Sequence, residues 1–234
     1  MNTLALLLIV ISAFFHATWN LLAKRTNGGA TTIWQYDIAS AAIYAPFALV
    51  LLISLHVQIG LVALVFIIGS AILHLSYFIL LQRGYRMGDL SFVYPLARGI
   101  GPFLSTILAI IVFGEHPTII AFCGMLLVVI GVLLITGGPH ILKRIHNRQM
   151  LIYVVLIGIC IAGYTLWDKQ AVSVFFVSPI LLYYFTIILR MILLSPYAFL
   201  HWEEIRLEWQ AHRFDILGVA ILSPLAYFLV LTAL

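Results

Sequence analysis

Eight long apolar segments constrain the fold of this chain more than any other feature of its sequence. Each segment is about 20 residues long, and a helix of that length rises about 30 Å, the thickness of the hydrocarbon core of a bilayer. The eight segments are residues 3–23, 33–55, 61–82, 92–113, 118–137, 149–167, 178–200 and 215–234. Of the 234 residues 64% are hydrophobic and only 9% are charged, whereas soluble domains are about 45–50% apolar. The sequence therefore predicts an all-α, polytopic membrane protein with about eight transmembrane helices in a lipid bilayer.

The composition and the motifs also exclude several classes of protein. The net charge of +4 is explained by basic cytoplasmic loops, so no nucleic-acid partner is expected. Cys123 and Cys160 both lie in apolar segments, which argues against a disulfide framework. The chain has no catalytic, phosphate-binding or dinucleotide-binding motif. We therefore expect no enzyme activity, no catalytic residue, no cofactor and no metal site.

The loops give an orientation and contain one ambiguous segment. The loops after the first, third, fifth and seventh segments hold nine Lys and Arg residues, and the opposite side holds only Lys169. The positive-inside rule then places the N-terminus outside. In the connector 201–215, residues Trp202, Ile205 and Trp209 are spaced i, i+3, i+7. This spacing fits an amphipathic helix in the membrane interface, and a solvated loop is the alternative.

Two short echoes indicate an internal repeat. Tyr164–Ala171 can be laid over His16–Ala23 at an offset of 148 residues, and Leu225–Phe228 over Leu75–Phe78 at an offset of 150. The first repeat, residues 1–140, then has five spans, and residues 149–234 form a partial second repeat with three. Because five is odd, the second repeat enters the membrane from the opposite side, as in many secondary transporters. A complete second repeat would extend to roughly residue 280–290, so two spans are expected to be missing.

Four stretches carry motifs in a defined order, namely His16–Lys24 in the first span, Ala71–Ser91 in the third span and its turn, Tyr94–Glu115 in the fourth, and Gly124 and Gly131 in the fifth. Together they resemble the first, third, fourth and fifth helices of the drug/metabolite transporter superfamily, specifically its EamA-type members. The resemblance implies two inverted five-helix repeats in a bacterial inner membrane, moving a small metabolite or drug-like solute by alternating access, with proton coupling as an option. The second repeat lacks the last two helices of that pattern. The alternative is therefore a truncated, non-transporting protein, either a remnant or a chain active only as a homodimer or with a partner chain.

Polar residues inside the spans mark a candidate substrate cavity. His16 and His74 each lie 13 residues into parallel spans, and Arg98 lies at a similar depth in an antiparallel one. Buried charges in a membrane are costly and usually face a cavity. The candidate cavity residues are His16, Trp19, Asn20, His74, Tyr77, Tyr94, Arg98, Arg190 and Tyr227.

Each of the main candidates has a functional and a structural interpretation. Arg98 could bind a substrate carboxylate, or snorkel to the interface as a structural residue. His16 and His74 could relay protons, or remain uncharged and hydrogen-bonded between helices. Arg190 lies near the middle of its span, where snorkelling is hardest. Asp168 is expected to pair at the surface, and Tyr183 to pack between helices.

Overall fold

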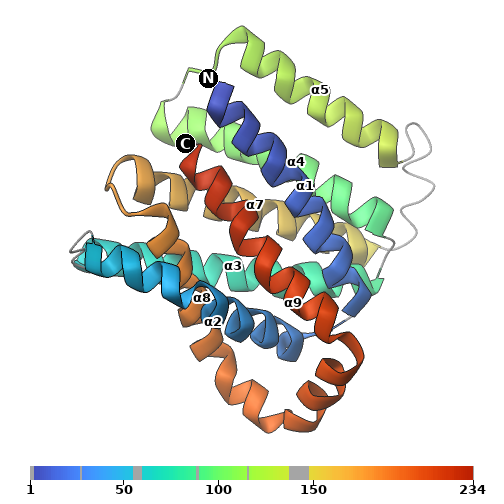
Figure 1. Ribbon diagram of the computed structural model, residues 1–234. Helices are drawn as coiled ribbons and strands as arrows, with labels where there is room; N and C mark the ends of the chain where they lie inside the picture. The colour runs from blue at the N-terminus through green and yellow to red at the C-terminus, as the bar shows by residue number, and fades with distance from the viewer. Residues whose placement is uncertain are drawn as a thin grey trace. The chain divides into compact units, whose positions relative to one another are not determined.

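The computed structural model describes residues 3–26, 28–54, 60–87, 90–114, 116–136 and 148–233. These residues form eight long helices (Figure 1). The helices are α1 (Thr3–Thr26), α2 (Ala30–Ser54), α3 (Leu61–Met87), α4 (Leu90–Phe113), α5 (Ile119–Thr136), α7 (Arg148–Ser173), α8 (Pro179–Leu200) and α9 (Trp202–Thr232). All eight are long and apolar enough to cross a membrane. The predicted all-α, polytopic membrane protein is thereby confirmed.

Several helices are longer than the apolar segments that predicted them. α3 continues to Met87 rather than residue 82, and α7 continues to Ser173 rather than residue 167. The end of an apolar run marks where the side chains stop favouring lipid. The hydrogen-bonded helical backbone continues through the polar residues that follow. Residues 202–211 are helical and form the first part of α9, which is interrupted by one non-helical residue, His212. A helix there is confirmed and the loop alternative is wrong, while its place in the membrane interface stays a prediction.

The described residues form two compact units. Unit 1 contains residues 1–75 and 167–234, and therefore α1, α2, the first half of α3, the end of α7, α8 and α9. Unit 2 contains residues 76–166, and therefore the end of α3, α4, α5 and most of α7.

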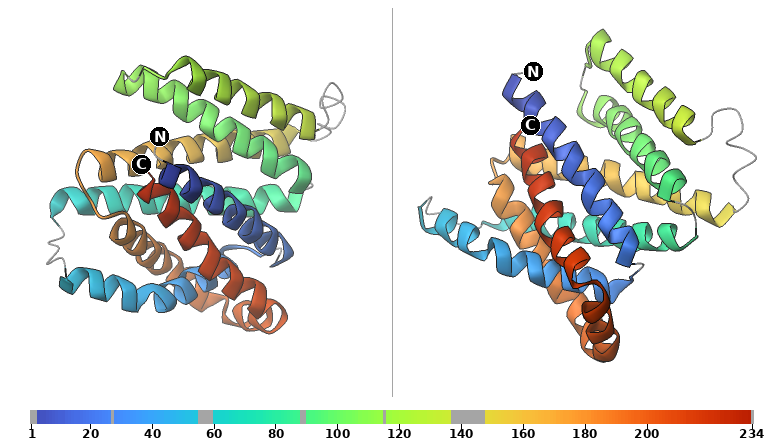
Figure 2. Two further views of the ribbon diagram at one scale, coloured as in Figure 1. Left: turned by 45° about the horizontal axis from the view of Figure 1, so that its top comes forward. Right: turned by 45° about the vertical axis from the view of Figure 1, so that its right-hand side comes forward.

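In unit 1, α9 packs along α1 and also against α2 and α8. Figures 1 and 2 show α1 and α9 side by side from three directions. Pro224 within α9 has no N–H to donate to the Ala220 carbonyl four residues earlier. Ser40 Oγ on α2 donates to that carbonyl at 2.9 Å. A freed backbone acceptor in the membrane must find another donor, so this contact joins α2 to α9 at a defined position.

In unit 2, glycines allow α4 and α7 to approach closely. A Cβ atom on Gly101 would lie 2.5 Å from Ile161 Cγ2, and one on Gly158 would lie 2.4 Å from Ile100 Cγ2. Small residues commonly permit such backbone contacts between transmembrane helices. α5 packs on α4 and leaves most of its surface exposed, including Ile119 and Ile120 at 83% and 85%. Such an apolar exposed surface suits contact with lipid.

Gly69 gives the first testable prediction about the fold. A Cβ atom at Gly69 would lie 2.5 Å from the Trp167 ring, and the Trp167 Nε1 donates to the Phe66 carbonyl at 2.9 Å. Gly69→Ala should displace the indole and lower the free energy of unfolding by about 1–3 kcal/mol. Thermal unfolding in detergent measures this loss. Gly124→Ala is the matched control, because no atom lies within 4 Å of its Cβ position. Equal melting temperatures for the two variants would contradict the predicted contact.

Candidate functional site

A buried ion pair joins α2 to α8 in unit 1. Arg190 donates from Nε to Asp37 Oδ2 at 3.2 Å and from Nη2 to the other carboxylate oxygen, so the contact is bidentate. The two side chains are only 3% and 1% exposed. The guanidinium carbon also lies 5.9 Å from the centre of the Tyr183 ring. An ion pair desolvated to this degree contributes little net stability, but removing one partner leaves an uncompensated buried charge.

A second buried polar group joins α3, α7 and α9. Asp168 Oδ2 lies 3.1 Å from His74 Nε2 and accepts a hydrogen bond of 2.6 Å from the Tyr227 hydroxyl. Asp168 is fully buried. Its other oxygen, Oδ1, has no hydrogen-bond partner among the described residues, and neither does the hydroxyl of buried Ser70, one turn before His74. A buried acceptor without a partner is costly, so Asp168 Oδ1 is a candidate acceptor for a donor group that the described residues do not supply.

Tyr183 connects these two groups into one cluster. Its ring centre lies 5.3 Å from that of His74 and 4.6 Å from that of Tyr227, and Arg190 lies over its face. Five helices thus bring six side chains together at the core of unit 1, and we call them the buried polar cluster. Its members are Asp37, His74, Asp168, Tyr183, Arg190 and Tyr227. Ionisable groups inside membrane helices are rare and usually mark solute or proton pathways.

The structure brings only some of the predicted cavity residues together. His74, Arg190 and Tyr227 are members of the buried polar cluster. On α1, Trp19 Nε1 donates to His16 Nδ1 at 3.0 Å, and Asn20 Nδ2 donates to the His16 carbonyl at 2.7 Å. Because His16 Nδ1 accepts a hydrogen bond from the indole N–H, the neutral ring carries its own hydrogen on Nε2. This local arrangement fits a hydrogen-bonded, uncharged His16.

The remaining three candidates lie in unit 2. Tyr77 is buried, and its ring centre lies 5.5 Å from that of Tyr164. Arg98 is half-buried on α4. Tyr94 lies on α4 too, but its side chain is outside the described part of the structure. A single cavity shared by all nine candidate residues remains a prediction.

Three residues of the cluster were not among the predicted cavity residues. Asp168 was expected to pair at the surface, and this is wrong because α7 extends past it and buries it completely. The sequence echo that aligns Asp168 with Asn20 was the signal that could have identified it. Asp37 lies inside a predicted span, and a charge there requires a partner. Tyr183 packs between helices as expected, and it also contacts the charged members of the cluster.

Comparison with protein-family models gives a match to the EamA-like transporter family over residues 3–137, more than half of the chain. Comparison with curated proteins and with solved structures finds no significant match. The family match confirms the resemblance that the motifs of the first five segments predicted.

Proposed function

Because the chain belongs to the EamA-like transporter family, we propose that it moves a small polar or amphipathic solute across a bacterial inner membrane by alternating access. The buried polar cluster is the observation that supports this proposal. A carboxylate, a histidine and an ion pair are desolvated together within apolar helices. Stability alone gives little reason to keep such groups in a membrane, whereas solute and proton binding require them.

Asp168 is the residue to which we assign the coupling proton. Its carboxylate receives the Tyr227 hydroxyl and faces His74 Nε2 through one oxygen, which leaves Oδ1 as the acceptor for an incoming proton or donor group. Protonation of Asp168 removes the negative charge that attracts these two donors. The contacts among α3, α7 and α9 then weaken, and this difference gives the two states that alternating access requires.

We assign Arg190 a structural role, although its position near the middle of its span made it a candidate for binding the solute. Both oxygens of Asp37 already bind its guanidinium, so a substrate carboxylate would have to compete with a bidentate internal partner. We therefore propose that Arg190 holds α8 against α2 and that the solute contacts Asp168, His74 and Tyr227. Arg98, in unit 2, stays a separate candidate for binding an anionic group.

Flux measurements on the purified 234-residue chain test this function. Proteoliposomes loaded with a panel of small metabolites should show saturable flux of at least one solute when a pH gradient is imposed. The flux should disappear when an ionophore collapses that gradient, and protein-free liposomes provide the leak rate. Well-folded protein that moves none of the solutes above the leak, with either sign of the gradient, would contradict the proposal.

A further inference from the structure

A cavity of about 530 Å³ opens between the start of α2 and the start of α9 in unit 1. Three of the five tryptophans in the chain line it, namely Trp34, Trp202 and Trp209. Trp34 and Trp202 meet edge to face, with ring centres 6.4 Å apart. The volume lies within the range of about 300–1,000 Å³ that is usual for small-molecule sites.

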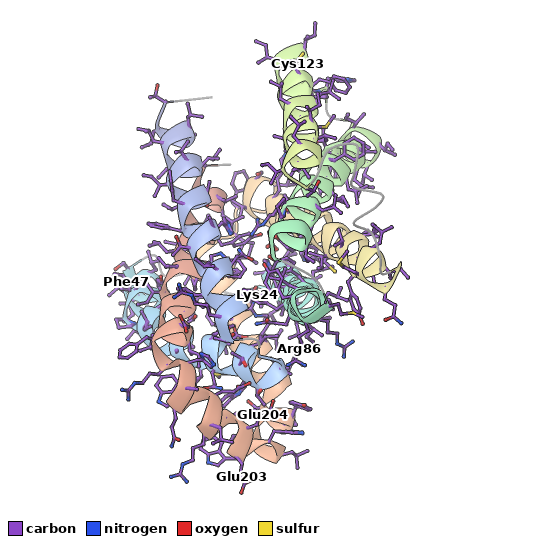
Figure 3. The ribbon with its side chains drawn as sticks, turned by 90° about the vertical axis from the view of Figure 1, so that its right-hand side faces the viewer. Lys24, Phe47, Arg86, Cys123, Glu203 and Glu204 are labelled. Carbon is purple, nitrogen blue, oxygen red and sulfur yellow. The ribbon has the colours of Figure 1, made fainter. Side chains whose placement is uncertain are left out.

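The cavity lies at a charged end of unit 1. α9 begins at the end of the unit opposite the two chain termini (Figure 1). Glu203 and Glu204 are exposed on its first turn (Figure 3). Tryptophan is enriched where a membrane protein crosses the headgroup region. A cavity lined by tryptophan beside exposed charges has the composition typical of the headgroup region.

The lining of the cavity includes a cation. Arg206 lines it, is exposed and makes no ion pair with any residue that the structure describes. A guanidinium presents a planar fork of donors that matches two oxygens of a phosphate. Arg206 therefore suits a phosphate group in the cavity.

The lining also includes Gln35, which is hydrogen-bonded to the Glu208 carboxylate. Gln35 lines the cavity, is 2% exposed and donates from Nε2 to Glu208 Oε2 at 2.8 Å. Glu208 Oε1 accepts from Thr32 at 2.7 Å and from Thr31 at 3.2 Å, so the carboxylate is held in place. The amide oxygen of Gln35 is itself buried, so the groups that can attract a cation in the cavity are the faces of the three tryptophan rings.

We propose that this cavity binds the headgroup of a zwitterionic phospholipid, with its phosphate at Arg206 and its ammonium at the tryptophan rings. The mouth of the cavity favours a lipid over a free solute. Ile38 and Trp202 there are 42% and 55% exposed, so acyl chains can continue over apolar surface. The bound lipid would be a structural ligand, because the site is separate from the buried polar cluster.

Native mass spectrometry of the detergent-purified chain tests the proposal. With phosphatidylethanolamine and phosphatidylglycerol supplied in equal amounts, one phosphatidylethanolamine molecule should be retained preferentially. Arg206→Gln should weaken that binding at least about tenfold, because a charge-assisted contact to the phosphate is lost. Arg213→Gln is the matched control, since Arg213 is exposed on the same helix and lies outside the cavity. It should bind the lipid like the unchanged protein.

Three results would overturn the proposal. Equal retention of both lipids would mean that the cavity does not recognise the ammonium. Equal losses in the Arg206 and Arg213 variants would mean that the lipid binds elsewhere. Displacement of the lipid by an equal concentration of soluble O-phosphoethanolamine would show that the headgroup is recognised without its acyl chains, and the natural ligand would then be a free solute.

Discussion

Replacing Arg190 with methionine is expected to lower the free energy of unfolding by about 3–5 kcal/mol, because it leaves the Asp37 carboxylate buried without its partner. Asp37 is 1% exposed and lies within an apolar helix, so water cannot replace the guanidinium. Unfolding in mixed detergent micelles, followed by circular dichroism, measures the loss. It is the largest stability change that we expect from any single substitution in this chain.

Two further variants separate the buried pair from a general effect of losing an arginine. The double variant Asp37→Leu with Arg190→Met removes both charges, and it should recover most of the lost stability since an apolar pair can replace a buried ion pair. Arg25→Met removes a partner from the pair with Asp215, whose atoms are 3.8 Å apart and whose arginine is 62% exposed. That change should cost less than about 1 kcal/mol. Similar losses for Arg190→Met and Arg25→Met would refute the assigned role of Arg190.

Replacing Asp168 with asparagine is expected to separate solute movement from proton coupling. Asparagine keeps the shape of the side chain and an acceptor for the Tyr227 hydroxyl, but it cannot take up a proton. Solute accumulation driven by a pH gradient should fall at least about tenfold, the scale of an ordinary coupling free energy. Exchange of labelled for unlabelled solute without a gradient should continue. Both quantities can be measured in the same proteoliposomes.

Asp215→Asn is the matched control for this prediction. Asp215 is a carboxylate on α9 that pairs with Arg25 and His212 outside the buried polar cluster, and its replacement should leave gradient-driven accumulation unchanged. Tyr227→Phe should give an intermediate loss, because Asp168 keeps its charge but loses one donor. Undiminished accumulation in Asp168→Asn would mean that the coupling proton binds elsewhere.

The helices and part of the candidate site could be predicted without coordinates. Apolar runs of about 20 residues leave few alternatives, since a backbone in lipid must satisfy its own hydrogen bonds and a helix does so within one segment. Charges and histidines inside such runs are costly, which is why His74 and Arg190 were identified. The internal repeat stays a prediction, which rests on echoes such as Trp19 and Trp167 at matching positions. None of these inferences depends on contacts between helices, because each follows from the residues of the segments and from the surrounding lipid.

The pairing of the polar side chains could not be predicted, because it depends on which helix faces meet. Arg190 and Asp37 are 153 residues apart, and nothing in either segment indicates the other as its partner. Asp168 follows the last apolar residue of its segment, and hydropathy therefore placed it at the surface. The tertiary structure buries it because α7 continues as a helix and brings it against His74 and Tyr227. Segment hydropathy reports the preference of a helix for lipid, whereas contacts between helices decide where a charge is paired.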